Sequence, residues 1–434
     1  MNEEKDRAIL VGLQLNDGSS FEHNLEELES LCQACDIAPV FTITQSLDAP
    51  HQALYIGSGK VHEVKEAAAN LDADLIIFDN ALSPSQARNL NLEIGLPILD
   101  RTALILEIFQ SRARSREAKL QVELARLQYL LPRLSGMGTA MSRQGGGSGS
   151  RSNKGAGEKK LELDRRHISH RITECKKELQ TIKKQRVTQR KSRNASQTPS
   201  VALVGYTNAG KSTILNAMLS HYGNDEITDI SHKKVLQEDM LFATLDTTVR
   251  KITIPGKPAF YLSDTVGFID KLPHHLIDAF RSTLEEAIGA DLLLQVVDVS
   301  DPYYREHMRV TQDTLNDLGA GDIPMIIAYN KADRLPQFAH DLPIVTGNHI
   351  HMAAGADLGM DALADLILSN LFGKPVTMEL LIPYSQGSLV HRISEAGEVA
   401  KTEYQNDGTY MQVTFTPSAK DHPLMQEVAS YRIG

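Results

Sequence analysis

Apolar residues recur along residues 7–101 in two alternating patterns. Short apolar runs, such as residues 7–15 and 74–79, alternate with longer runs such as residues 24–34, in which apolar positions return every three or four residues. The short runs predict β-strands, and the longer ones predict amphipathic helices. Because strands that alternate with helices form parallel sheets covered by helices, we expect a small parallel α/β domain over residues 1–101.

Residues 102–195 carry a purely helical period. Two runs repeat an apolar residue at intervals of four and three, namely Leu120, Leu124, Leu127 and Leu131, and then Ile168, Ile172, Cys175, Leu179 and Ile182. Each run presents one apolar stripe, as the helices of coiled coils do. The segment between them, about residues 135–157, is rich in Gly and Ser and predicts no helix. We expect an antiparallel, coiled-coil-like helical hairpin with a long tip loop.

Residues 196–373 return to alternating strands and helices. Strand-like runs, the first at residues 201–205 and the last at residues 343–347, are separated by helical stretches. This order is typical of a doubly wound nucleotide-binding sheet. Residues 374–434 contain two strand-like runs around a short helix and predict a small α+β domain without a chemical motif. The whole chain therefore belongs to the α/β class.

Charge is distributed unevenly along the chain. The net charge is −10, yet residues 151–193 hold 15 Lys and Arg against 5 Asp and Glu. Such asymmetry indicates a polyanion partner, although a solvated linker with scattered charge is the alternative on composition alone. The candidate RNA contacts are Arg143, Arg151, Lys154, Lys159, Lys160, Arg165 and Arg166.

A glycine-rich segment follows the first strand of the third unit. It reads GYTNAGKS over residues 205–212 and matches the phosphate-loop pattern G-x₄-G-K-[ST]. Glycines let the backbone wrap around phosphate groups, and the start of the following helix adds positive potential. We expect Lys211 to neutralise the β- and γ-phosphates and Ser212 to bind Mg²⁺.

Two further motifs stand at strand ends in the order that a GTPase requires. DTVG, residues 264–267, places the Asp264 carboxylate at the outer Mg²⁺ shell and the Gly267 N–H at the γ-phosphate. NKAD, residues 330–333, offers the Asp333 carboxylate to the N1–H and the exocyclic amine of guanine, and adenine has no such pair of donors. The three motifs together predict GTP or GDP, rather than ATP, as the ligand.

With these motifs the chain resembles the HflX family of translation-associated GTPases over nearly its whole length. Inside the GTPase unit the resemblance rests on GYTNAGKST, FATLDTTVR, DTVGFIDKLPHHLIDAFRSTLEEA and NKAD. Outside it, YIGSGK, LSPSQARNL, LELDRR and the segment that begins LDRTALILEIFQSRAR are similar to the family's other segments. The resemblance implies a Ras-like P-loop GTPase domain and a GTP hydrolase that binds the large ribosomal subunit and its RNA, and that splits or rescues stalled ribosomes under stress.

The resemblance also assigns metal and catalytic residues. It implies a Mg²⁺-binding switch I threonine at Thr244, with Thr247 and Thr248 as alternatives, and an asparagine at Asn208 that binds K⁺, unless Asn208 is a simple turn residue. The implied catalytic residues are Lys211, Thr244 and Gly267. The other expected GTP contacts are Gly205, Tyr206, Thr207, Ala209, Gly210, Phe242, Ala243, Leu245, Asp246, Thr265, Val266, Asn330, Lys331, Ala332, Ala353, Ala354 and Gly355.

Phe268 stands where many GTPases place the glutamine that orients the attacking water. A phenyl ring cannot orient water, so we expect slow hydrolysis until the ribosome, or K⁺ beside Asn208, completes the site. Two other hypotheses stay open. The chain could be a GTP-gated RNA-binding or scaffolding module in which hydrolysis is incidental, or a GTPase that assists RNA modification or ribosome assembly.

The remaining patterns have ordinary interpretations. Cys32 and Cys35 lie in a helical pattern without a second ligand pair, so we expect plain helix thiols and no zinc site. Gly57 to Lys60 resembles a phosphate loop but lacks its spacing, which favours a tight strand-to-helix turn over a second nucleotide site. No apolar run approaches the roughly 20 residues of a membrane span, and we expect a cytoplasmic, monomeric protein.

Overall fold

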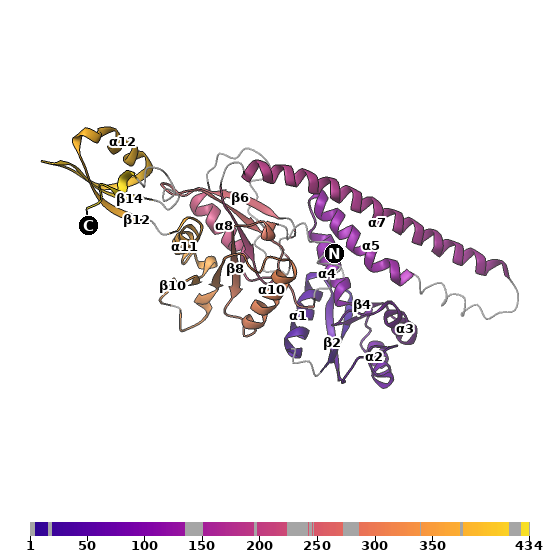
Figure 1. The fold of residues 1–434 in the computed structure, drawn as a ribbon. Helices are drawn as coiled ribbons and strands as arrows, with labels where there is room; N and C mark the ends of the chain where they lie inside the picture. Colours follow the sequence, from indigo (N-terminus) through magenta and orange to yellow (C-terminus); the bar gives the residue numbers. More distant parts are fainter. Residues whose placement is uncertain are drawn as a thin grey trace.

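The computed structural model describes residues 5–15, 20–134, 151–194, 198–223, 242, 245, 247–271, 286–338, 340–373, 376–415 and 427–433. Figure 1 shows an N-terminal α/β domain, a long helical hairpin, a second α/β domain (the G domain) and a small C-terminal domain in chain order. The predicted fold class is confirmed. Within the described ranges, no helix combines the length and the apolar character that a membrane crossing requires.

The N-terminal domain is built on a four-stranded sheet of order β2-β1-β3-β4. All three strand pairs run parallel, because each strand is followed by a helix that returns the chain to the same edge. Gly57 is the N-cap of α2, and Lys60 in its first turn forms an ion pair with Glu63 at 2.6 Å. Because β2 ends at Ser46, the segment is a helix start rather than the tight strand-to-helix turn that was expected. The elements are β1 (Arg7–Gln14), α1 (Phe21–Ala34), β2 (Ala38–Ser46), α2 (Ser58–Asn70), β3 (Leu75–Phe78), α3 (Pro84–Ile94) and β4 (Ile98–Asp100).

Helix α4 (Arg101–Arg112) packs with the N-terminal domain, although the sequence pattern grouped it with the hairpin. Its apolar side chains, including Ile105 and Phe109, join the same buried cluster as Leu10 and Leu28 of the N-terminal domain. Apolar residues surround much of α4, whereas a helix of a two-helix hairpin buries a single stripe. Helix α4 therefore closes one face of the first domain.

The hairpin consists of α5 (Arg116–Leu134) and α7 (Arg151–Asn194). Leu120 and Leu124 pack against the buried Cys175, as the apolar stripes predicted. Arg171 donates two hydrogen bonds to the carboxylate of Glu123, at 2.6 and 2.7 Å, and so joins the two helices through a bidentate ion pair.

The prediction that residues 135–157 hold no helix was wrong for its last part, because α7 begins at Arg151. Residues 135–150, including Arg143, lie outside the described residues. A glycine costs a helix only about 1 kcal/mol relative to alanine. The glycines at positions 155 and 157 are therefore tolerated, since extending a helix that is already nucleated gains one hydrogen bond per residue.

The G domain surrounds a seven-stranded sheet of order β10-β11-β9-β8-β5-β7-β6. Strand β5 lies between β7 and β8 and is parallel to both, which places the phosphate-loop segment at the middle of one sheet edge. The three-residue β11 was not predicted because a period cannot be read from so few residues. The elements are β5 (Ser200–Val204), α8 (Lys211–Tyr222), β6 (Thr248–Ile252), β7 (Phe260–Asp264), β8 (Leu292–Asp298), α10 (Tyr304–Asp317), β9 (Met325–Asn330), η1 (Ala332–Arg334), β10 (Ile344–Thr346), β11 (His349–His351), η2 (Ala354–Ala356) and α11 (Met360–Phe372).

The C-terminal domain contains a three-stranded antiparallel sheet of order β12-β14-β13 with a helix, α12, packed against it. Leu380, Leu389 and Val413 belong to its core. Strand β13 was not predicted, because its sequence GEVAKTEYQ is mostly polar and almost wholly exposed. The elements are β12 (Val376–Ile382), η3 (Tyr384–Gln386), α12 (Gly387–Ala396), β13 (Gly397–Gln405) and β14 (Gly408–Phe415).

The N-terminal and G domains share one buried apolar cluster. Phe242, Leu245, Val266 and Ile269 of the G domain lie in the cluster that contains the core of α4 and one face of α5. The rings of Phe109 and Phe242 meet edge to face, with their centroids 4.7 Å apart. This edge-to-face contact joins the N-terminal domain to the G domain, although the two rings are far apart in the sequence.

Candidate nucleotide-binding site

The phosphate loop connects β5 to α8 through backbone that suits glycine. Gly205 and Gly210 have φ values of 141° and 98°. A Cβ atom on Gly205 would lie 2.3 Å from the carbonyl oxygen of Val296, and one on Gly210 would lie 2.2 Å from Nδ2 of Asn330. Both glycines are therefore required by close backbone approach as well as by φ. The loop leads directly into the N-terminus of α8, where unpaired N–H groups favour anions.

Lys211 is the first residue of α8 and is buried beneath the loop. Its ammonium group donates hydrogen bonds to the carbonyl oxygens of Gly205 at 3.0 Å and Tyr206 at 2.7 Å. Burial lowers the pKa of Lys211 to about 8, and the nearby Asp264 carboxylate opposes that shift. The loop thus holds a poorly solvated cation, which anionic phosphate groups would stabilise.

Ser212 and Asp264 meet across the end of the sheet. Asp264 ends β7, and the Ser212 hydroxyl donates a 2.7 Å hydrogen bond to its carboxylate. Hydroxyl and carboxylate oxygens are the hard ligands that Mg²⁺ prefers, so this pair fits the ion. Bound there beside phosphate, Mg²⁺ would neutralise charge on the phosphate oxygens. Ala243, Thr244 and Asp246 lie outside the described residues.

The DTVGF segment lies directly on the phosphate loop. The N–H of Thr207 donates to the carbonyl of Phe268 at 2.8 Å, and the N–H of Phe268 donates to the carbonyl of Gly205 at 3.1 Å. A Cβ atom on Gly267 would lie 2.8 Å from Cα of Thr207 and 3.0 Å from Nζ of Lys211. Only glycine fits here, and its backbone lies beside the lysine that phosphate would contact.

The side chains of the DTVGF segment face in several directions. The Phe268 ring is 2% exposed and packs in the G-domain core with Val204 and Leu293. The Thr265 hydroxyl donates to the carbonyl of Leu203 at 2.6 Å, and Val266 joins the interdomain cluster. Thr265 and Val266 can therefore contact a nucleotide only through their backbone. Phe268 is a core residue that cannot orient water.

Asn330, at the end of β9, joins two loops. Its Nδ2 donates to the carbonyl of Ala209 at 2.9 Å, and its Oδ1 accepts the N–H of Ala354 at 2.9 Å. The expected guanine-supporting loop, Ala353 to Gly355, thus lies beside the phosphate loop. Asp333, in η1, is exposed and available to a base.

Lys331 connects the NKAD segment to the phosphate loop. Its ammonium group donates to the carbonyl of Asn208 at 2.8 Å and pairs with Asp298 at 2.7 Å. Asp298, which ends β8, was missed by sequence reasoning, and its only signal is that position at a strand end. The structure brings the three predicted motifs together at one sheet edge.

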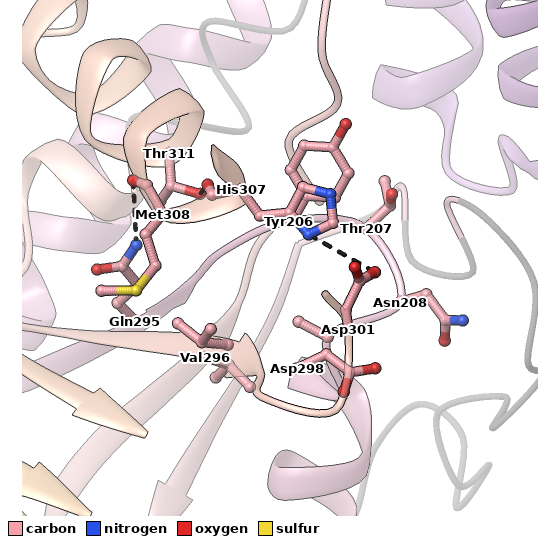
Figure 2. Close-up of a pocket in the computed structure, with 12 residues that line it drawn as sticks. Tyr206, Thr207, Asn208, Gln295, Val296, Asp298, Asp301, His307, Met308 and Thr311 are labelled. Carbon is pink, nitrogen blue, oxygen red and sulfur yellow. Dashed lines mark hydrogen bonds and ion pairs between the residues drawn. The ribbon is translucent and has the colours of Figure 1, made fainter. Parts of the chain in front are cut away.

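A small cavity of about 60 Å³ lies behind the phosphate loop. Figure 2 shows side chains that line it. It is lined by Asn208, Asp298, Asp301 and His307 among others. The Asn208 side chain is exposed and its φ is 59°, so it can take part in a turn and still offer an amide oxygen to a cation. The Asn208 amide oxygen and the carboxylate oxygens of Asp298 and Asp301 are of the kind that binds K⁺.

Models of known families match three consecutive segments of the chain. Residues 22–110 match "GTP-binding GTPase N-terminal", residues 112–193 match "GTP-binding GTPase Middle Region", and residues 200–331 match "50S ribosome-binding GTPase". The boundary near residue 111 agrees with the packing of α4 on the first domain.

Curated relatives match almost the full length. GTPase HflX of Lacrimispora saccharolytica is 41% identical over 418 residues, which are 96% of this chain and 95% of the relative. The chain belongs to the HflX family of GTPases. GTPase HflX of Escherichia coli K12 is 37% identical over 93% of this chain and 92% of its own length. A solved structure, the "crystal structure of SsGBP and GDP complex", is 24% identical with a TM-score of 0.45 and covers 85% of this chain and all of its own.

Proposed function

We propose that this HflX-family GTPase binds the large ribosomal subunit, hydrolyses GTP to GDP and phosphate faster there than alone, and splits or rescues stalled ribosomes. Two findings support the proposal. The phosphate loop and the Ser212–Asp264 pair have the arrangement that a nucleoside triphosphate with Mg²⁺ would require. The family model that matches residues 200–331 describes a 50S ribosome-binding GTPase.

The observation that carries the proposal is the position of α5. One face of α5, including Val122 and Ala125, shares a buried cluster with Phe242 and Leu245, which lie near the expected switch I. Its other face packs on α7 through Leu120 and Leu124. Helix α5 thus connects the basic helix to the nucleotide side of the G domain. If binding to a ribosome displaced the hairpin, the packing of α5 against Phe242 and Leu245 would change.

Helix α7 offers the charge that an RNA surface requires. Basic side chains along its described part are exposed, namely Arg165, Arg166, Lys176, Lys177, Lys183 and Lys184. Helix α7 also contains Arg151, Lys154, Lys159 and Lys160, which extend the basic sequence toward the hairpin tip. Neutralising phosphates with such residues makes binding depend steeply on salt. We assign this helix to ribosomal RNA contact.

The proposed cofactors follow from the same site. Mg²⁺ would be held by Ser212 with Asp264 in its outer shell, and Thr244 is the proposed switch I ligand. K⁺ beside Asn208 would add positive charge next to the phosphates. Because Phe268 is buried in the core, the group that orients water must come from elsewhere.

Sedimentation with purified ribosomal subunits tests the proposal. Co-migration with the large subunit in a non-hydrolysable GTP analogue, and release in GDP, is the expected result. GTP turnover in potassium buffer should rise when large subunits are added. Turnover that stays unchanged, with binding retained, would instead favour a GTP-gated RNA-binding or scaffolding module. No binding to either subunit would remove the ribosome from the proposal.

Charge neutralisation on α7 tests the RNA contact separately. Changing Arg165 and Arg166 to Gln should weaken large-subunit binding and reduce the dependence of affinity on salt by about one unit of slope for each lost phosphate contact. A matched control is Arg116→Gln, because Arg116 pairs with Glu178 within the hairpin. Equal effects of the two changes would show a loss of hairpin structure rather than of RNA contact.

A further inference from the structure

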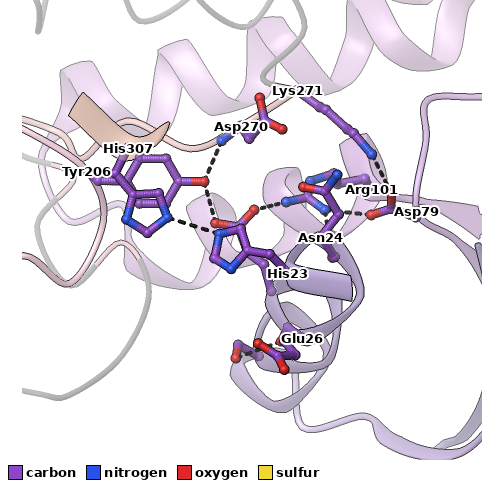
Figure 3. A network of polar contacts seen from close by, with 11 residues as sticks. His23, Asn24, Glu26, Asp79, Arg101, Tyr206, Asp270, Lys271 and His307 are labelled. Carbon is purple, nitrogen blue, oxygen red and sulfur yellow. Dashed lines mark hydrogen bonds and ion pairs between the residues drawn. The ribbon is translucent and has the colours of Figure 1, made fainter. Parts of the chain in front are cut away.

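Tyr206 connects the phosphate loop to the N-terminal domain. It follows Gly205 in the loop, and its side chain lies beside His307 with its hydroxyl directed toward Asp270 (Figure 3). Its hydroxyl donates a 2.6 Å hydrogen bond to Oε1 of Glu27 in α1 and accepts the N–H of Asp270 at 2.8 Å. Its ring stacks on His307, with centroids 3.8 Å apart and an angle of 11° between the planes. One side chain thus contacts the N-terminal domain, α10 and the residues after DTVGF.

A buried row of charged side chains connects Glu27 to Lys271, the residue that follows Asp270. Arg101 is 1% exposed and pairs with Glu27 and, at 2.6 Å, with Asp79. The second oxygen of Asp79 accepts a 2.5 Å hydrogen bond from Lys271. The two carboxylates and two cations balance in charge, which offsets much of the cost of removing them from water. Lys271 is therefore held by the N-terminal domain directly, and Asp270 is held through Tyr206, which bonds to Glu27.

These contacts hold the backbone that follows Gly267. Phe268 is bonded to Gly205 and Thr207 on one side, and Asp270 and Lys271 are held on the other. The result fixes Gly267 beside Lys211, so close that a Cβ atom on residue 267 would lie 3.0 Å from Nζ of Lys211. The Gly267 backbone is therefore already in position before a nucleotide binds. A γ-phosphate that then contacted Lys211 would lie next to it.

We propose that Tyr206, together with the Asp79–Lys271 ion pair, is a positioning device through which the N-terminal domain holds the DTVGF segment ready for the γ-phosphate. These side chains select GTP over GDP by holding the DTVGF segment, because their own contacts are with protein groups. The inference rests on the proposed GTP-dependent function. When the DTVGF segment is ordered before binding, the entropy cost of binding is lower. Only GTP carries the γ-phosphate that would contact this segment, so GTP gains and GDP does not.

The chemistry of Tyr206 suits this role. Burial raises the pKa of the Tyr206 hydroxyl, so the group keeps its proton and can donate to Glu27 while it accepts from Asp270. Tyr206→Phe removes only the hydroxyl and retains the ring that stacks on His307. Lys271→Ala releases the segment from the opposite side and leaves Asp79 paired with Arg101. Two variants with different folding risks thus interrupt the same device.

The test measures the affinities of the full-length protein for GDP and for a non-hydrolysable GTP analogue with Mg²⁺. Both variants should weaken analogue binding by about three- to tenfold and change GDP binding by less than about twofold, which is the size expected from a modest population shift. Hydrogen exchange at the Asp270 amide should become at least about tenfold faster in Tyr206→Phe, because its acceptor is gone.

Tyr222→Phe is the matched control, because the Tyr222 hydroxyl bonds to Asp361 within the G domain. It should leave the ratio of analogue to GDP affinity unchanged. Equal weakening of both nucleotides in Tyr206→Phe, or an unchanged ratio in both test variants, would overturn the positioning role while leaving the GTPase proposal intact. If the unaltered protein bound neither nucleotide, the proposed function and this inference would both be rejected.

Discussion

The hydroxyl of Ser212 donates a 2.7 Å hydrogen bond to the carboxylate of Asp264, which lies 52 positions later in the chain. The contact joins the first turn of α8 to the last residue of β7. It brings a neutral and an anionic oxygen ligand to one point beside Lys211. Parallel packing of β5 and β7 makes this possible, since Leu203 and Asp264 are in register at the same sheet edge.

Ser212→Ala should remove the proposed Mg²⁺ ligand while the phosphate loop remains. We expect the dependence of GTP affinity on Mg²⁺ concentration to flatten, with at least a tenfold loss of GTP affinity at saturating Mg²⁺, about 1.4 kcal/mol. Titration of a fluorescent GTP analogue at several Mg²⁺ concentrations measures this. Ser220→Ala is the matched control, since the Ser220 hydroxyl bonds within α8, to the carbonyl of Asn216. An unaltered Mg²⁺ dependence would remove Ser212 from the metal site.

Nucleotide affinity should fall as pH rises through about 8, the value to which burial lowers the pKa of Lys211. Bound phosphates favour the charged ammonium, so above that pH binding must include uptake of a proton, whereas below it the lysine is already charged. The affinity for GDP should fall about fourfold between pH 6.5 and pH 8.5. Calorimetry in buffers of different ionisation enthalpy should show the proton uptake. Lys211→Arg should bind with a flat pH profile, and a flat profile in the unaltered protein would contradict the prediction.

Asp333→Asn should change base preference from guanine toward xanthine. The carboxylate of Asp333 is exposed at the expected base position, whereas an amide can donate to the oxygen that xanthine carries in place of the amine. Competition between GDP and xanthosine diphosphate for the site measures the shift, which should exceed about tenfold. Asp341→Asn, an exposed change in the same domain, serves as control. Retained guanine preference in Asp333→Asn would place the base elsewhere.

Phe268→Gln should destabilise the protein without creating a hydrolase that works unaided. The ring packs with Val204 and Leu293 in the core, so an amide placed there loses apolar burial and lacks a partner. We expect a loss of about 3 kcal/mol in the free energy of unfolding of the G domain, and no rise in unaided GTP turnover. Urea unfolding and single-turnover assays measure the two quantities. Higher turnover would show that position 268 reaches the attacking water.

The cysteines should resist thiol reagents in the native protein. Burial raises the pKa of both Cys32 and Cys35 to about 12, so almost no reactive thiolate forms at pH 8. Reaction with a coloured disulfide reagent should be slow in buffer and should reach all three cysteines after unfolding in urea. Fast reaction of Cys35 at pH 8 would contradict its ordinary role as a packed helix thiol.

The sequence specified the elements whose period is strong. It predicted the parallel N-terminal sheet, the α5–α7 hairpin and the nucleotide-binding sheet, because each strand or helix carries its own apolar pattern. It did not predict β13, whose polar residues are organised by pairing with β14. It also placed the start of α7 too late, since local composition does not register the stabilisation of a long helix that continues past the glycines.

The candidate site divides in the same way. The sequence by itself determined which residues form the phosphate loop, the DTVG motif and the NKAD motif. The chemistry of each motif depends on short spacings at a strand end. Only the tertiary structure decided where Phe268 and Tyr206 point. Phe268 enters the core of its own domain, and Tyr206 bonds to Glu27, 179 positions away. Such partners are selected by domain packing, which brings together side chains that no local pattern relates.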